Sequence, residues 1–199
     1  YGGFTGVETQ RDEGDWVAHP TILSGDIDGD GTRANNSYHV VFLNGVSNGS
    51  ITAATVVNGF IITGGNADGD MLLDFNGGGV FCDGSSSGHE CSPLLANLLI
   101  SGNHANTNGG GMYNYGVFGR SSPQLTNVTL RDNSAGQFGG GMYNNGIAGS
   151  SSPQLTNAVI MGNTAGLHGG GIFNDGDSGA SNPQLMNVTI SGNSATYGG

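Results

Sequence analysis

Lysine is absent from this sequence of 199 residues, and its only fixed cations are four arginines, Arg11, Arg33, Arg120 and Arg131. Fifteen carboxylates stand against them and give a net charge of −11. A chain with so few cations repels nucleic acid and anionic membrane surfaces, so we expect neither as a partner. No segment approaches the ~18 consecutive apolar residues of a membrane span, and no targeting segment is recognisable.

Cysteine and proline are also scarce, with two and five residues, whereas glycine supplies 40. Glycine at this level costs too much backbone entropy for helices, and there is no Gly-X-Y period of the collagen type. The other apolar residues are mainly Val, Ile, Leu, Phe and Tyr, and they come in short runs. This composition is typical of short β-strands that are separated by tight turns.

A repeat of thirty residues fills the second half of the chain. The phrase CSPLLAN at 91–97 returns as SSPQLTN at 121–127 and 151–157 and as SNPQLMN at 181–187. A second phrase, GGGVFC at 77–82, returns as GGGMYN or GGGIFN at 109–114, 139–144 and 169–174. Fixed spacing of this kind predicts a solenoid, in which each repeat forms one coil and buries its apolar face against its neighbours.

Each repeat reads as three short strands, and we predict an all-β fold, a right-handed parallel β-helix of about 30 residues per coil. The handedness follows from the general preference of parallel crossovers. We expect a single β-helix domain over 1–199, with irregular N-terminal coils in 1–76 and regular repeats in 77–199. Residues 20–26 and 37–45 read as strands of irregular early coils, and we expect about seven coils in all.

Alternation along the strands assigns the side chains to the two faces. Leu95, Leu125, Leu155 and Leu185 are expected to point inward, with glutamines outward beside them. Asparagines recur at the corners, and Asn58 is expected to form the corner of an earlier coil. Because Asn tolerates the left-handed conformation and stacked amides hydrogen-bond to one another, we predict structural ladders. The principal ladder consists of Asn97, Asn127, Asn157 and Asn187, and a second consists of Asn103, Asn133, Asn163 and Asn193.

The two cysteines depart from the repeat. Cys82 occupies the column of Asn114, and Cys91 occupies that of Ser121, but the interval between the columns is nine residues here and seven elsewhere. The extra residues therefore lie between the cysteines, which predicts a disulfide that closes an enlarged loop. A disulfide implies an oxidising, extracytoplasmic location. Two free thiols are the alternative.

The segment DIDGDGT at 26–32 has the acidic spacing of a calcium loop. Asp26, Asp28 and Asp30 offer carboxylates and Thr32 its carbonyl, so we predict calcium as a bound ion and no other cofactor. The twelfth position is Ser37 instead of a bidentate glutamate, and no helices flank the loop. A solvated acidic turn is therefore the alternative. A weaker second cluster consists of Asp68, Asp70 and Asp74.

Catalytic groups are few, and we predict no catalytic residues. The regular coils offer only scattered titratable side chains, namely Asp132, Asp175, Asp177 and His168. The other histidines are isolated, with no spacing typical of zinc. Acidic pairs of the N-terminal coils could nevertheless serve glycoside hydrolysis. Aromatic residues share one column of the repeat, where they form either a sugar-binding surface or a cross-strand ladder. They are Phe81, Tyr113, Tyr143 and Phe173.

These motifs give the chain a resemblance to a known family. The patterns GGG[MI][YF]N, S-x-PQL-x-N and GN-[ST]-A, with PTILSGDIDGD and NGFIITGGNA upstream, resemble bacterial right-handed parallel β-helix repeat proteins related to the polymorphic outer-membrane-protein group. The resemblance implies a secreted or surface-anchored bacterial protein of a group that includes adhesins and few enzymes. Pectate lyases and polygalacturonases share the fold, but their catalytic Arg, Lys or Asp sets are not recognisable here.

We therefore expect a non-catalytic secreted or cell-surface scaffold, adhesin-like or structural. The chain begins at Tyr1 and stops at Gly199, part-way into another glycine-led strand, so we expect either further coils in a longer protein or end-to-end stacking into an extracellular filament. The expected partners are the ends of other copies, or a surface glycan or protein. The alternative is a carbohydrate-active enzyme, a pectate-lyase-like polysaccharide lyase or glycoside hydrolase, or a glycan-binding module.

Overall fold

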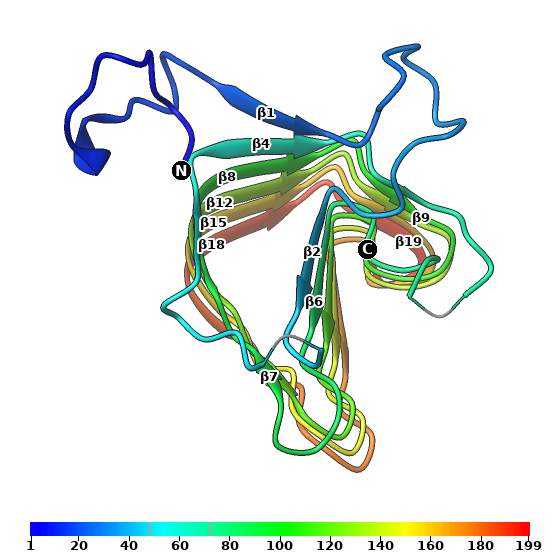
Figure 1. Ribbon diagram of the computed structural model, residues 1–199. Helices are drawn as coiled ribbons and strands as arrows, with labels where there is room; N and C mark the ends of the chain where they lie inside the picture. Colours follow the sequence, from blue (N-terminus) through cyan, green and yellow to red (C-terminus); the bar gives the residue numbers. More distant parts are fainter. Residues whose placement is uncertain (48, 72) are drawn as a thin grey trace.

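The computed structural model describes residues 1–47, 49–71 and 73–199, and within them it contains β-strands, one short 3₁₀ helix and no α-helix. The strands pair in parallel and form a β-solenoid of about four turns with roughly 30 residues per turn, as the repeat predicts. Figure 1 shows the layers stacked from β1 at one end to β18 at the other. The 3₁₀ helix η1 (Arg11–Glu13) lies in the segment that precedes β1.

Seven strands form the longest sheet, and β12 lies in it between β8 and β15 with Leu125 opposite Leu95 and Leu155. The eight-residue strands of this sheet each include two of the predicted strands. The corner between those two falls inside β12 at Asn127, whose φ is 55°. The seven strands are β1 (Thr21–Ser24), β3 (Val56–Asn58), β4 (Phe60–Thr63), β8 (Leu94–Ser101), β12 (Gln124–Arg131), β15 (Gln154–Met161) and β18 (Gln184–Ser191).

Two five-stranded sheets and one strand pair complete the coil. The first, which we call the aromatic sheet, contains β2 (Val41–Asn44), β6 (Val80–Asp83), β10 (Met112–Tyr115), β14 (Met142–Asn145) and β17 (Ile172–Asp175). The second, the corner sheet, contains β5 (Asn66–Ala67), β9 (His104–Ala105), β13 (Ser134–Ala135), β16 (Thr164–His168) and β19 (Ser194–Tyr197). The pair consists of β7 (Glu90–Cys91) and β11 (Arg120–Ser121).

The main hydrophobic core runs along the axis of the solenoid. Leu95, Leu125 and Leu155 are each 1% exposed, and each lies above its counterpart in the neighbouring coil. Burial of one such side chain stabilises the fold by roughly 1.5–3 kcal/mol. Leu185 occupies the same column but is 48% exposed, because β18 is the last strand of its sheet. The core is therefore closed within the stack and open at its C-terminal edge.

The early coils differ from the expectation in two respects. Strand β1 pairs with β4, and β2 pairs with β6, so the segments 20–26 and 37–45 form two sides of one turn. This shared turn is one reason why the stack has fewer coils than the seven expected. The corner after β3 also lies one residue later, at Gly59, whose φ is 80°. Glycine adopts this conformation without the penalty that a Cβ imposes, which displaces the corner from Asn58.

Candidate functional site

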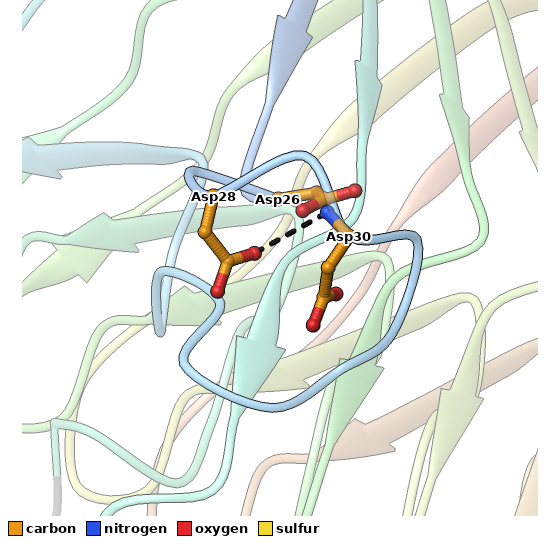
Figure 2. A group of neighbouring side chains, drawn as sticks. All are labelled: Asp26, Asp28 and Asp30. Atoms are coloured by element: carbon orange, nitrogen blue, oxygen red, sulfur yellow. Dashed lines mark hydrogen bonds between the residues drawn. The ribbon is translucent and has the colours of Figure 1, made fainter.

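The acidic loop between β1 and β2 is the one cluster of potential metal ligands among the described residues. One carboxylate oxygen from each of Asp26, Asp28 and Asp30 lies within 4.8 Å of the others. Figure 2 shows the three side chains on a single exposed loop, in which the amide of Asp30 donates to Oδ1 of Asp28 at 3.4 Å. The described residues contain no second such cluster, so Asp68, Asp70 and Asp74 do not form the weaker one that the sequence suggests.

Hydrogen bonds within the loop hold the carboxylates in place. Asp26 accepts from the amides of Gly29 and Gly31 at 2.9 and 3.1 Å. Thr32 donates its amide to Oδ1 of Asp30 at 2.7 Å, and its hydroxyl donates to Oδ2 at 3.1 Å. Three carboxylates form an all-oxygen donor set of the type that Ca²⁺ prefers, and the ion's remaining ligands would come from carbonyls and water. The donor set therefore suits calcium, and calcium binding stays a prediction.

The base of the acidic loop is fixed to the solenoid. The amide of Ser37 donates to the carbonyl of Gly25 at 2.8 Å, which brings the two ends of the loop together. The side-chain Nδ2 of Asn36 donates to the carbonyl of Gly64 at 2.7 Å, and the side-chain Nδ2 of Asn66 donates to the carbonyl of Arg33 at 3.0 Å. Ser37 therefore closes the loop at its base. It does not contribute a bidentate carboxylate at the twelfth position, in contrast to an EF-hand.

The corner asparagines form a continuous hydrogen-bonded column on the outside of the coil. Each amide Nδ2 donates to Oδ1 of the preceding coil, over 3.1 Å from Asn127 to Asn97 and 2.7 Å from Asn187 to Asn157. The column extends to Asn58, which accepts from Asn97 at 3.0 Å. Its four repeat members, from Asn97 to Asn187, have φ values of 52–55°, a left-handed conformation that asparagine tolerates, whereas Asn58 lies one residue before its corner. Their side chains connect one coil to the next and serve the fold.

A second asparagine column lies in the interior. Asn133 is 1% exposed, and its Nδ2 donates both to Oδ1 of Asn163 at 3.0 Å and to the carbonyl of Ile100 at 2.9 Å. Its own Oδ1 accepts from the amide and the Nδ2 of Asn103 at 3.1 and 3.0 Å. Each member thus satisfies backbone groups that the sharp turn leaves unpaired. These residues are likewise structural.

The cysteines form the predicted disulfide. Cys82 and Cys91 are fully buried and bonded to each other, with their Cα atoms 5.7 Å apart. In the registers of the neighbouring strands Cys82 lies opposite Asn114 and Cys91 opposite Ser121, as the repeat alignment predicts. A disulfide of this kind persists in an oxidising compartment. The covalent link is therefore consistent with a protein that functions outside the cytoplasm.

The aromatic column forms a ladder of contacting rings on the outer face of the aromatic sheet. The ring centroids of Phe81 and Tyr113 are 5.0 Å apart, those of Tyr113 and Tyr143 5.2 Å, and those of Tyr143 and Phe173 5.4 Å. Phe138 and other apolar side chains pack against this cluster, so that Phe81, Tyr113 and Tyr143 are at most 4% exposed. These three rings are therefore a second core and present no surface on which a sugar ring could stack.

The aspartates Asp132 and Asp175 of the regular coils contact different partners and do not come together in one site. The hydroxyl of Tyr143 donates to Oδ2 of Asp175 at 3.1 Å, and burial raises the pKa of Tyr143 far above its ordinary value. Asp132 pairs with Arg131 at 3.0 Å on the surface. One contact that the sequence does not indicate joins Nδ1 of His104 to Oγ of Ser134 at 2.8 Å. These two residues face each other across β9 and β13, and only knowledge of the register reveals the pair.

None of the helices within the described ranges has the length and hydrophobicity that a bilayer crossing requires. When the chain is compared with known proteins, it has no significant match among family models, curated proteins or solved structures.

Proposed function

We propose that this chain is a non-catalytic scaffold of the extracellular space or the bacterial cell surface, adhesin-like or structural. The observation that carries the proposal is the use of the repeated polar residues. The asparagines of the corner and interior ladders form hydrogen bonds with other residues of the stack. Each recurs at a fixed place in the thirty-residue repeat, where its side chain bonds to the neighbouring coil. A repeat whose polar side chains maintain the stack is suited to build a rigid rod, and the disulfide supports placement outside the cytoplasm.

The scaffold extends, in this proposal, through the open edge of its last coil. Leu185, Met186 and Ile190 of β18 are 48%, 64% and 47% exposed, although the first and last of them continue columns that are buried in every preceding regular coil. An unpaired strand with exposed apolar residues is a template for another strand. A further parallel coil, whether of the same polypeptide or of a second copy, would bury these side chains. We propose that copies of this chain associate through this edge.

Sedimentation velocity and electron microscopy of the purified chain test the association. We expect a mass that rises with protein concentration, and more strongly at high salt, because salt screens the repulsion between acidic copies. Leu185→Asp places a charge in the edge and is expected to abolish the association. Gln154→Asp adds the same charge on an exposed position of β15 and is the matched control. A monomer at every concentration and salt level would contradict the assembly.

A panel of plant and bacterial polysaccharides, with and without calcium, tests the non-catalytic part of the proposal. We expect no cleavage product with any of them. Reproducible cleavage that is lost after Asp26→Asn, Asp28→Asn or Asp30→Asn would overturn the scaffold proposal and favour a carbohydrate-active enzyme. Binding without cleavage would agree with an adhesin-like scaffold and would identify its ligand.

A further inference from the structure

The outer face of the seven-stranded sheet changes character along the stack. One outward column begins with Ile22, Ile61 and Leu99 in the first three layers. At the same register the later layers carry Thr129, Val159 and Thr189. This one column is thus apolar in its first three layers and mostly polar beyond them. Three neighbouring apolar side chains on an outward face form a patch, and contiguous apolar patches mark interaction sites more often than single exposed apolar residues do.

The N-terminal segment covers this apolar area only in part. Hydrogen bonds tie the segment to the sheet, from the amide of Gly2 to the carbonyl of Asn58 at 2.8 Å and from the amide of Gly3 to Oγ1 of Thr21 at 3.0 Å. In Figure 1 the segment lies beside the N-terminal ends of β1 and β4. Between the segment and the sheet there is a cleft of about 310 Å³. Ile61 and Leu99 line one side of the cleft, and Trp16 and Val17 line the other.

The wall that carries Trp16 is held by a defined turn. Oδ1 of Asp15 accepts from the amides of Val17 and Ala18 at 3.0 and 2.9 Å, and its carbonyl accepts from the amide of His19 at 2.8 Å. Gly59 lies at the floor, where a Cβ would come within 3.3 Å of Cβ of Trp16 and 2.9 Å of the carbonyl oxygen of Gly2. Glycine at this point lets the segment approach the sheet. The cleft is therefore formed before any ligand binds.

The chemistry of the lining defines the ligand. The cleft is lined by Trp16, Val17, Pro20, Gly59, Phe60, Ile61 and Leu99, none of which has a charged side chain. Its volume is at the lower end of the range for small-molecule sites, roughly 300–1,000 Å³. The segment beside it carries four acids, Glu8, Asp12, Glu13 and Asp15, and one cation, Arg11, so that its net negative charge repels anions. The indole of Trp16, 39% exposed, offers a face on which a planar ring can stack.

We propose that this cleft binds an uncharged, mainly hydrophobic small molecule with a planar ring system, which stacks on Trp16 and contacts Ile61 and Leu99. The site is independent of the scaffold role, because the open edge at β18 and the cleft at β4 lie at opposite ends of the stack. Binding gives the scaffold a ligand-carrying function at its N-terminal coils.

Calorimetry with two matched naphthalene probes tests the site. We expect 1-naphthalenemethanol to bind with saturation. Its anionic analogue 1-naphthalenesulfonate is expected to bind at least about tenfold more weakly, because the acidic segment repels it. Equal affinity for the two probes, or a signal that does not saturate, would overturn the proposal.

A matched pair of variants locates the site. Leu99→Thr introduces the residue that the next coil carries at the same register, and it is expected to weaken binding of 1-naphthalenemethanol by about tenfold. Val159→Thr makes the equivalent change two coils further along, outside the cleft, and should leave the affinity within about twofold of the original. Urea unfolding of both variants checks that they fold. If folded Leu99→Thr binds as well as Val159→Thr does, the cleft is not the binding site.

Discussion

Cys82 lies opposite Asn114 in the register of β6 and β10, so that the disulfide occupies a position at which the next three coils carry an asparagine. Asn114 donates from Nδ2 to Oδ1 of Asn144 at 2.7 Å, and Asn144 donates to Asn174 at 2.8 Å. At the other end of this ladder the buried Oδ1 of Asn114 has no hydrogen-bond donor among the described residues. A covalent link thus replaces the ladder where the enlarged loop begins.

Removal of the disulfide is expected to lower the free energy of unfolding by about 2–3 kcal/mol, the entropy of closing a loop of about ten residues. Cys82→Ala with Cys91→Ala gives the full loss. Cys82→Asn with Cys91→Ser introduces the pair that stands at Asn114 and Ser121, and its amide can donate to the unpaired Oδ1. We therefore expect this second variant to recover about 1 kcal/mol of the loss. Urea denaturation measures both, and equal stability of the two variants would contradict the ladder argument.

The corner ladder that contains Asn127 and the interior ladder that contains Asn133 are expected to differ in their contribution to stability. Asn133→Ala removes four hydrogen bonds and leaves buried backbone groups unpaired, so it should lower the free energy of unfolding by about 3–5 kcal/mol. Asn127→Ala loses exposed ladder bonds and places alanine at a φ of 55°, which should cost about 1–2 kcal/mol. Gln154→Ala, on an exposed position, serves as the control in urea unfolding. Similar losses for the two ladders would show that burial does not decide their contribution.

The regular coils could be predicted from the sequence because equivalent residues recur at a fixed interval. The interval of thirty residues places Leu125 on Leu155, and the recurring glycine-led phrase aligns Cys82 with Asn114 across a step of 32 residues. The early coils could not be predicted in this way. Their irregular spacing hides the fact that β1 and β2 share one turn, and it also hides the true corner at Gly59.

Of the two candidate sites, the acidic loop could be found from the sequence and the cleft at Trp16 could not. The acidic cluster is local in sequence, so its residues could be named from a five-residue pattern. The cleft at Trp16 depends on how an irregular segment folds back on the sheet, and the outward column that it partly covers becomes visible only once Ile61 is known to lie beside Leu99. Contacts between segments without a repeat carry no periodic signal, which explains why this cleft could not be found from the sequence.

Calcium is expected to bind the acidic loop with a dissociation constant of roughly 10⁻⁴–10⁻³ M, the range of extracellular modules. Asp28→Asn is the most informative variant, because the described hydrogen bonds give the side chain of Asp28 a single long contact, whereas that of Asp26 holds two amides. We expect it to weaken binding at least about tenfold. Asp177→Asn, which removes an acid from another exposed loop, should have no effect. Calorimetry that detects no binding, or equal weakening in both variants, would identify a solvated acidic turn.

Acidification below neutral pH is expected to destabilise the fold through His39. Burial lowers the pKa of His39 below its ordinary value of 6.5, although Nδ1 lies 2.9 Å from the carbonyl oxygen of Gly77. The ring also packs against Phe81, with centroids 5.2 Å apart, and this contact forms part of its burial. In the window between the folded pKa and 6.5, the unfolded chain therefore binds a proton that the folded chain does not. Stability is complete above 6.5 and falls as the pH decreases through this window.

The contribution of His39 can be isolated with one substitution and one control. His39→Asn keeps a donor near the carbonyl of Gly77 but does not titrate, so the loss of stability between pH 7.5 and pH 5 should become smaller. The slope is expected to keep a residual part from His104, whose pKa is also lowered by burial and by the positive charge of Arg33. Gln154→Ala, on an exposed position, removes no titratable group and should leave the slope unchanged. Urea unfolding at a series of pH values measures the slopes, and an equal slope in His39→Asn and the unmodified chain would show that His39 is not the group that responds.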